Sequence, residues 1–302
     1  EPEYVAISAD NSQAFVTLQE NNAVAVVNLR TNRIDRIVPM GYKNHGLAAN
    51  AIAASDKVSA SSPFVLKPYA NLLGIYMPDG IATFSANGSS YFITANEGDD
   101  RDDFLAKDQK ETQRVGHSSM VLGSSAFANA ADLKKETELG RLTVISTMGR
   151  NSNGQYEKLY TLGGRSFSIY NASTGAQVYD SGSDLEKLAY STMPSALLGK
   201  EQVLGRLDNK GPEPESVVVG QVNRKTYAFV ALERASAILM YDLTDPGAPK
   251  FVQWLQNTSD LSNGDISPEG LSFVPASQSP TGHALLIAGY EVSGTVAVWE
   301  IK

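Results

Sequence analysis

The sequence contains no cysteine and no long apolar run. The lack of cysteine excludes disulfide bonds, thiolate metal sites and cysteine nucleophiles. Without a run of about 18 apolar residues, no segment is a candidate for a transmembrane helix. The three histidines, His45, His117 and His283, stand far apart and lack the spacing of a zinc site. Any site in this chain therefore has to be built from oxygen ligands and charged side chains.

The chain also has fewer basic residues than acidic ones. The chain has 25 Lys and Arg against 33 Asp and Glu, a formal net charge of −8. This balance disfavours binding to nucleic acid, which depends on neutralising phosphates. With 302 residues, 42% of them hydrophobic, the chain can bury a large core, and no break in composition divides it. We therefore expect a single domain, or a fragment of one, over residues 1–302.

A Pro-acid pair recurs along the chain, and each copy is followed at a similar distance by a second acid. The separations from the proline to the second acid are 18, 19, 19 and 23 residues, and the longest spans an insertion at 275–282. An internal period of this kind is the signature of a repeat fold. The four copies are Pro2-Glu3 with Glu20, Pro78-Asp79 with Glu97, Pro214-Glu215 with Glu233, and Pro268-Glu269 with Glu291.

Short β-branched and aromatic runs, bounded by turn residues, surround each copy and read as strands. The sequence predicts an all-β fold, a β-propeller of four-stranded antiparallel blades with about five blades in this chain. The last repeat has only three expected strands, over residues 270–301, and the N-terminus has no spare strand for it. Because an open edge invites association, we expect the C-terminal part of a larger propeller, its missing N-terminal blades removed or carried on another chain.

Three segments depart from the repeat. Residues 41–77 are rich in Ala and Ser and are expected to be an insertion between blades. Residues 98–138 interrupt the second blade, which strands at 141–146 and 159–162 are expected to complete. Residues 163–209 are expected to form a degenerate blade, in which Arg165 takes the place of the acid.

Both acids of each copy should lie on one face of the propeller. The first strand of a blade runs away from the face to which the second strand returns, and the acids stand at the start of one and the end of the other. We expect them to meet near the mouth of the central channel. The predicted set is Glu3, Glu20, Asp79, Glu97, Glu215, Glu233, Glu269 and Glu291.

Two interpretations of this set are open. In the first, each acid accepts hydrogen bonds from turn amides or pairs with a neighbouring cation such as Arg234, and the repeat is purely architectural. In the second, some of the acids bind a hard divalent cation, with Ca²⁺ favoured by the oxygen ligands. Arg165 would then clamp an anionic group bridged to the metal. The acidic run 97–103 is either a second cation site or a solvated charge cluster.

Five short motifs of the chain carry a family resemblance: Glu1-Pro-Glu-Tyr-Val, Thr94-Ala-Asn-Glu-Gly-Asp, Gly163-Gly-Arg-Ser, Lys210-Gly-Pro-Glu-Pro-Glu and Glu291-Val-Ser-Gly-Thr. They resemble the choice-of-anchor I family, which includes mesenchyme-specific cell-surface glycoproteins and some bacterial members labelled alkaline phosphatases. The resemblance covers essentially the whole chain and implies an exported or surface-attached propeller of about seven blades, with roughly two of them before Glu1.

Two functions follow as expectations for a secreted, periplasmic or cell-surface protein. One is the binding of an extracellular ligand or matrix component through the acid-rich channel face, with Ca²⁺ as the ion. The alternative is a metal-dependent phosphomonoesterase that acts on a phosphate ester at the channel mouth, although the sequence shows no obvious nucleophile. Its metal ligands would include Glu215, Glu233, Glu269 and Glu291, and Arg165 would be its phosphate clamp.

Overall fold

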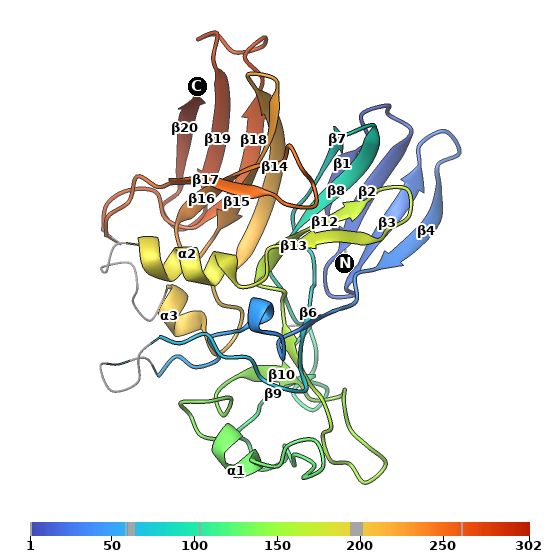
Figure 1. Cartoon of the computed structure of the whole chain (residues 1–302), viewed down its shortest axis with the longest axis vertical. Helices are drawn as coiled ribbons and strands as arrows, with labels where there is room; N and C mark the ends of the chain where they lie inside the picture. Colours follow the sequence, from blue (N-terminus) through green and yellow to red (C-terminus); the bar gives the residue numbers. More distant parts are fainter. Residues whose placement is uncertain (1, 58, 60–63, 103, 194–201, 261) are drawn as a thin grey trace.

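A computed structural model describes residues 2–57, 59, 64–102, 104–193, 202–260 and 262–302. Most of the regular structure in these ranges is β-strand, grouped into five sheets. Three of the sheets have four antiparallel strands, as the sequence predicts, and a fourth has three. These four sheets lie side by side in the upper part of Figure 1.

The first sheet follows the predicted hairpins closely. Asn11, Asn22 and Asn32 take left-handed backbone conformations in the turns, with φ between 51° and 56°, which asparagine tolerates better than most residues. The strands are β1 (Pro2–Ile7), β2 (Gln13–Leu18), β3 (Ala23–Asn28) and β4 (Arg33–Pro39), paired in chain order.

The third and fourth sheets also keep the chain order of their strands. Polar turns such as Asn223-Arg224, both at positive φ, close their hairpins. The third sheet consists of β14 (Pro214–Val222), β15 (Lys225–Leu232), β16 (Ala237–Asp242) and β17 (Lys250–Leu255). The fourth consists of β18 (Pro268–Val274), β19 (Ala284–Tyr290) and β20 (Thr295–Ile301).

The second sheet corrects the predicted blade boundaries. It consists of β7 (Ile81–Ala86), β8 (Ser89–Asn96), β12 (Ser166–Asn171) and β13 (Gln177–Asp180). Strand β12 pairs antiparallel with β8 along its whole length, so residues 163–180 complete this sheet and do not open a degenerate blade. The described strands therefore form four blade-like sheets, one fewer than expected. A prediction from local sequence patterns pairs each strand with the next one along the chain. The partner of β8 is instead β12, which follows only after the long segment between residues 97 and 165.

The two predicted insertions come together as one small sheet. Strands β5 and β6 come from the first insertion and β9 from the second, and β6 pairs in parallel with β11, which follows the second insertion. Leu72, Val144 and Leu159 are buried in a core of this region, which lies below the other sheets in Figure 1. The sheet order is β5 (Tyr42–Asn44), β6 (Leu72–Ile75), β11 (Leu159–Leu162), β10 (Thr143–Ile145) and β9 (Thr112–Arg114). Strands β10 and β11, expected in the second blade, belong here.

Helices are few and short among the described residues. Leu185, Ala189 and Val203 from two of them pack into the core shared by the second and third sheets, so the segment after β13 folds as helix and covers that core. Residues 194–201 of the predicted degenerate blade lie outside the described residues. The helices are η1 (Ala48–Asn50), α1 (Ala130–Leu133), α2 (Asp184–Thr192) and α3 (Val203–Arg206).

The sheets pack against one another through their first strands and their aromatic residues. Strand β1 contacts β7, β7 contacts β14, and β14 contacts β18. Phe15 lies 5.3 Å from Phe92 between the first two sheets, measured between ring centroids. Phe229 lies 5.7 Å from Phe273 between the last two. Such ring pairs add about 0.5–1.5 kcal/mol beyond the burial of their area, and the stacking places the starts of all four first strands close together.

Candidate functional site

The Pro-acid pair forms a β-bulge at the start of the first strand in three of the sheets. In the third sheet Pro214 pairs with Leu232, but Val217 pairs with Val230, so one extra residue stands in β14. The same one-residue shift follows Pro2 and Pro268. A bulge bends the strand and re-aims a side chain, and proline is tolerated there because no ladder hydrogen bond is lost. The bulge in the repeated motif thus directs the side chain of the first acid of each of these copies toward the end of the sheet.

The residue before the proline is held in a left-handed conformation in three copies. Met77, Glu213 and Ser267 have φ of 49°, 52° and 62°, a conformation that costs about 1–3 kcal/mol in a residue other than glycine. The carbonyl oxygens of Glu213 and Ser267 accept the backbone N–H of Glu233 and Glu291, each at 2.9 Å. The strained residue thereby fixes the second acid of the copy beside the first.

All eight acids predicted from the repeat line one cavity of 370 Å³. Asp79, Glu97 and Glu233 are buried, whereas Glu3, Glu269 and Glu291 are exposed at its rim. Their role as metal ligands stays a prediction. We call this space the acid-rich cavity. Its other lining residues are Tyr4, Gln19, Asp99, Phe104, Lys210, Glu213 and Arg234.

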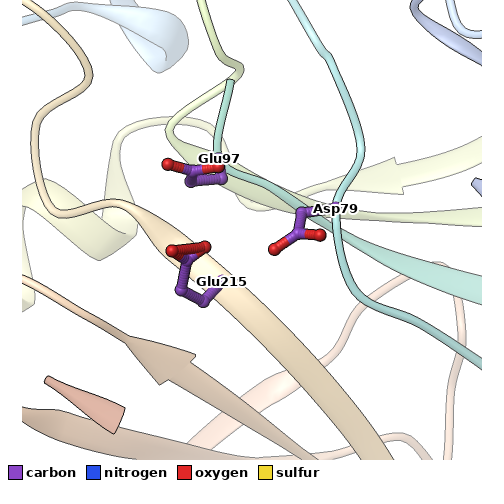
Figure 2. A group of neighbouring side chains, drawn as sticks. All are labelled: Asp79, Glu97 and Glu215. Atoms are coloured by element: carbon purple, nitrogen blue, oxygen red, sulfur yellow. The ribbon is translucent and has the colours of Figure 1, made fainter. Parts of the chain in front are cut away.

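Asp79, Glu97 and Glu215 form the first close group in the acid-rich cavity. One carboxylate oxygen from each lies within 4.8 Å of the others, and Figure 2 shows the three side chains gathered from separate segments. The N–H of Gly80 donates to the carbonyl oxygen of Glu215 at 2.9 Å, which joins the second sheet to the third. A Cβ at Gly80 would lie 2.5 Å from Cα of Ser216, so only glycine allows this approach.

Glu97, Glu213 and Glu233 form a second group with the same 4.8 Å limit. This group has its own cations. Glu213 accepts from Nε of Arg206 at 2.5 Å and from Nε of Arg234 at 2.9 Å, while Lys210 pairs with Glu97. Sequence reasoning missed Glu213, although the doubled Pro-Glu of residues 212–215 is a signal that could have identified it.

Gln19 is a second residue that sequence reasoning missed. It follows β2 directly, at the position that Glu97, Glu233 and Glu291 occupy after the second strands of the other sheets. Its Nε2 donates to Oε2 of Glu97 at 2.7 Å. The predicted Glu20 lies one residue further on. Counting from the pairing of Pro2 with Leu18 gives the correct register, which the sequence separation alone did not.

The carboxyl groups of the first group resist ionisation. Burial, followed by the charge of Glu97, raises the pKa of Asp79 to about 8. Burial and the charges of Glu97 and Asp79 raise the pKa of Glu215 to about 11. Burial also raises the pKa of Glu97 to about 7, against the opposing effect of Lys210. A proton shared between Asp79 and Glu215 relieves the repulsion in the absence of a cation.

Glu213 shows the opposite behaviour in the same cavity. Burial opposes its ionisation, but Lys210, Arg206 and Arg234 outweigh that effect and lower its pKa. Among the described residues, no ion pair reaches Asp79 or Glu215. Arg206, Lys210 and Arg234 therefore pair with Glu97, Glu213 and Glu233, and the ion pairs among the described residues leave out Asp79 and Glu215.

The structure corrects the predicted role of Arg165. Its side chain is 1% exposed and does not line the acid-rich cavity. Nη1 donates to the carbonyl oxygen of Ala53 and to Glu186, and Nη2 donates to the carbonyl oxygens of Leu207 and Asn209, at 2.8–2.9 Å. Because β12 is a third strand, Arg165 does not stand where the acids do. It ties the sheet to the helical segment and has no terminal donor left for phosphate.

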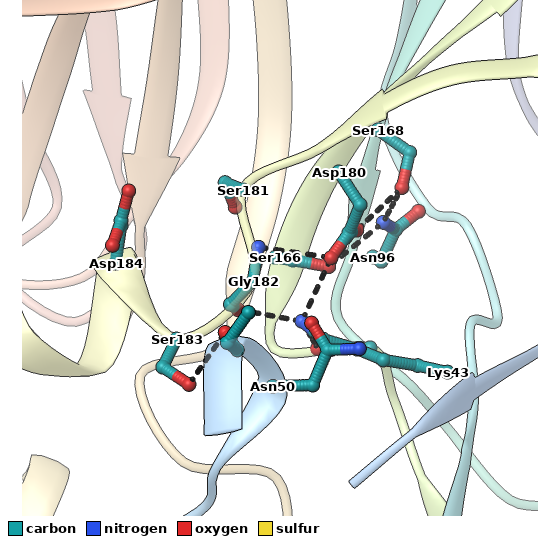
Figure 3. Close-up of polar contacts among 12 residues, drawn as sticks. Lys43, Asn50, Asn96, Ser166, Ser168, Asp180, Ser181, Gly182, Ser183 and Asp184 are labelled. Atoms are coloured by element: carbon teal, nitrogen blue, oxygen red, sulfur yellow. Dashed lines mark hydrogen bonds and ion pairs between the residues drawn. The ribbon is translucent and has the colours of Figure 1, made fainter. Parts of the chain in front are cut away.

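A buried polar network holds the insertion sheet to the second sheet (Figure 3). Nζ of Lys43 donates to the carbonyl oxygens of Gly164 and Gly182 at 2.8 and 2.6 Å and lies 3.1 Å from Oδ1 of Asp180. Oδ2 of Asp180 accepts from the hydroxyls of Ser166 and Ser168. All three ammonium donors have acceptors, so this network is structural.

The described residues of the acidic run 97–103 have two different roles in the structure. Glu97 and Asp99 line the acid-rich cavity. Oδ1 of Asp100 accepts the N–H of Asp102 at 2.8 Å, and Asp102 accepts the N–H of Glu111 at 2.6 Å. These two acids stabilise the local turn, and residue 103 lies outside the described residues. The predicted second cation site in this run stays a prediction.

The model of the choice-of-anchor I domain matches residues 1–246. The chain belongs to this family. It is 28% identical over 190 residues to gigasin-3a of Magallana gigas, covering 56% of this chain and 67% of that protein. It is also 28% identical over 248 residues to the mesenchyme-specific cell surface glycoprotein of Strongylocentrotus purpuratus, covering 70% of this chain but 30% of that protein.

Among solved structures, this choice-of-anchor I domain is similar to the periplasmic gluconolactonase of Pseudomonas aeruginosa, with 12% identity and a TM-score of 0.36. That alignment covers 100% of this chain and 66% of the gluconolactonase. Within the described residues, no helix is long and apolar enough to cross a membrane.

Proposed function

We propose that this choice-of-anchor I domain is an exported or cell-surface β-propeller that binds Ca²⁺ and an extracellular partner through the acid-rich cavity. The four sheets, stacked through their first strands, have the arrangement of propeller blades. The name of the relative from Strongylocentrotus purpuratus, a cell surface glycoprotein, supports the location. A binding role fits a cavity that is lined mainly by carboxylate oxygens.

The carboxyl pair of Asp79 and Glu215 carries this proposal. It lies within 4.8 Å of a third carboxylate, that of Glu97, and no ion pair among the described residues neutralises it. A divalent cation would favour ionisation of the pair and remove the repulsion. Ligands that are all oxygen, most of them carboxylate, suit a hard cation such as Ca²⁺, which accepts six to eight of them in flexible geometry.

Phosphomonoester hydrolysis is less well supported. The hypothesis assigns the phosphate clamp to Arg165, and the guanidinium of Arg165 is committed to four acceptors elsewhere. The two cations that line the acid-rich cavity, Lys210 and Arg234, are engaged by Glu97, Glu213 and Glu233. We therefore propose binding and not catalysis.

Terbium luminescence tests the ion site directly, because Tyr4 lines the cavity and can sensitise a bound lanthanide. Metal-free protein should bind Tb³⁺ at saturation, and Ca²⁺ should displace it. The double variant Asp79→Asn and Glu215→Gln should lose at least about tenfold in Ca²⁺ affinity, a loss of about 1.4 kcal/mol. The control Glu300→Gln, outside the cavity, should bind as the parent does.

Two outcomes would argue against the proposal. The ion site is wrong if the parent shows no saturable binding, or if the double variant binds Ca²⁺ as tightly as the parent. A chromogenic phosphate ester should be tested in parallel with Ca²⁺ and with chelator. Turnover that depends on the metal and is lost in the double variant would replace binding with catalysis as the function of the cavity.

A further inference from the structure

A second cavity adjoins the acid-rich cavity and differs from it in chemistry. It has a volume of 240 Å³, and Glu20 lines both. Four of its lining residues are apolar, and we call it the apolar pocket. Its lining consists of Ile75, Met77, Ile145 and Met148, with Glu20, Asp100, Arg101, Glu111 and Thr147.

Residues 99–101 and Phe104 border the two cavities. Asp99 and Phe104 line the acid-rich cavity, whereas Asp100 and Arg101 line the apolar pocket. The side chain of Phe104 is 72% exposed. A large aromatic residue this exposed, beside a charged cavity and an apolar one, is the composition expected of an interaction site.

Hydrogen bonds hold the described residues on either side of this border to the rest of the protein. The carboxylate of Asp102 accepts hydrogen bonds from the backbone N–H of Glu111 at 2.6 Å and from Oγ1 of Thr112 at 2.5 Å. The N–H of Phe104 donates to the carbonyl oxygen of Arg101 at 3.0 Å. These bonds restrain the backbone at Asp102 and at Phe104, which lowers the entropy cost of using Phe104 as a contact.

The charge of the acid-rich cavity indicates what would bind there. Ten acidic residues and two basic ones line it, and one divalent cation would leave a large excess of negative charge. The rim carboxylates of Glu3, Glu269 and Glu291 lie outside the two close groups. A basic ligand matches this rim, and the face of the Phe104 ring attracts an ammonium or guanidinium group.

We propose that this surface binds a basic peptide segment in which a lysine or arginine is flanked by an apolar residue. The cationic side chain lies against the rim carboxylates and Phe104, and the apolar side chain enters the apolar pocket. Met77 and Met148 give that pocket walls that adapt to different side chains. The inference rests on the proposed function, since it names the partner that the acid-rich cavity binds.

Calorimetry with blocked pentapeptides tests the inference, in calcium and in chelator. The first peptide has a central lysine flanked by leucines, the second a central lysine flanked by serines, and the third a central glutamate flanked by leucines. Only the first should bind appreciably, and it should lose about tenfold in affinity to each variant, Phe104→Ser and Met148→Ser. Phe251→Ser, which changes an exposed aromatic outside both cavities, is the matched control.

The peptide proposal is overturned by three results. These are no binding of the first peptide, equal binding of the glutamate peptide, or equal losses in the Phe251→Ser control and the Phe104→Ser variant. Phe104→Ser should leave the affinity for Ca²⁺ unchanged, which separates the two proposals. Peptide binding without Ca²⁺ binding would remove the ion site alone, and Ca²⁺ binding without peptide binding would remove the peptide segment alone.

Discussion

Glu213 and Glu215 stand two residues apart, yet their surroundings differ in charge. Glu213 is fully buried among Arg206, Lys210 and Arg234, so its carboxylate is stabilised. Glu215 faces Asp79 and Glu97 and has a raised pKa. Two glutamates of one motif thus have different physical roles, one in the architecture of the cavity and one in the proposed ion site.

Glu215→Gln should separate stability from binding. The substitution removes a carboxyl from a crowded acidic group, so the free energy of unfolding in chelator should rise by about 1 kcal/mol. Ca²⁺ affinity should fall at least about tenfold, which corresponds to about 1.4 kcal/mol. Thermal unfolding in chelator and Tb³⁺ displacement measure the two effects.

Glu213→Gln is the matched comparison for this prediction. It leaves three cations without their shared carboxylate, and breaking a buried ion pair costs about 3–5 kcal/mol. If Glu215→Gln destabilises the protein as much as Glu213→Gln does, then Glu215 is an architectural residue as well, and the first interpretation of the repeated acids is correct.

At the scale of the element, hairpins can be predicted from the sequence, but the pairing of strands that are distant in the sequence cannot. Strands β1 to β4 and β14 to β17 follow from turn residues and alternating apolar runs, because each strand pairs with the next one in the chain. Strand β12 pairs with β8 across a long excursion, and β6 pairs with β11 across another. Local sequence patterns do not predict these strand pairs, because pairing between strands so far apart in the sequence depends on how the whole core packs.

Gly80→Ala should test how the second and third sheets hold the acids together. The added methyl would lie 2.5 Å from Cα of Ser216 and 2.8 Å from the carbonyl oxygen of Glu215. The two backbones must move apart, at a cost of about 1–3 kcal/mol, and Ca²⁺ affinity should fall because Asp79 moves relative to Glu215. Chemical denaturation and Tb³⁺ titration measure both.

Gly270 provides the control for this prediction. It follows the acid of the last copy, as Gly80 follows Asp79, but a Cβ there meets nothing within 4 Å. Gly270→Ala should change stability by no more than about 0.5 kcal/mol. Equal costs at the two glycines would mean that the inter-sheet contact at Gly80 does not position the acids.

At the scale of the whole molecule, the buried carboxyls should set the pH dependence of stability. The pKa values of Asp79 and Glu233 are raised to about 8 and that of Glu97 to about 7, against about 4 in an unfolded chain. Between about pH 4 and 8 the folded state binds more protons than the unfolded state, so stability falls as pH rises.

Thermal unfolding in chelator should therefore show a lower Tm at pH 8 than at pH 5, with each 1 kcal/mol lost equal to about 2–4 °C. Saturating Ca²⁺ should raise the Tm more at pH 8 than at pH 5, because fewer protons compete with Ca²⁺ for the carboxylates at pH 8. The double variant Asp79→Asn and Glu215→Gln should flatten the dependence. A Tm that rises steadily from pH 5 to 8 in chelator would contradict this account.

The first and last sheets leave apolar faces in solvent. Val5 and Val296 are 60% and 68% exposed, and β20 is an edge strand among the described strands. Exposed apolar faces and open edges favour association. We expect this chain to self-associate at micromolar concentrations, and Val296→Lys with Val298→Lys should shift it toward the monomer in light scattering. The same change at Val121, an exposed valine that belongs to no strand, should not.

The sequence by itself determined the family, the repeated four-stranded sheets and the eight acids that line one cavity. These follow from local hairpins, because a bulge at the first strand and a turn after the second carry both acids of a copy to the same end. Only the tertiary structure decided which acids have cations. Lys210 and Arg206 reach Glu97 and Glu213 from a segment that belongs to no sheet. The tertiary structure also decided that Arg165 is buried, because β8, the strand that pairs with β12, is distant from it in the sequence but adjacent to it in the sheet.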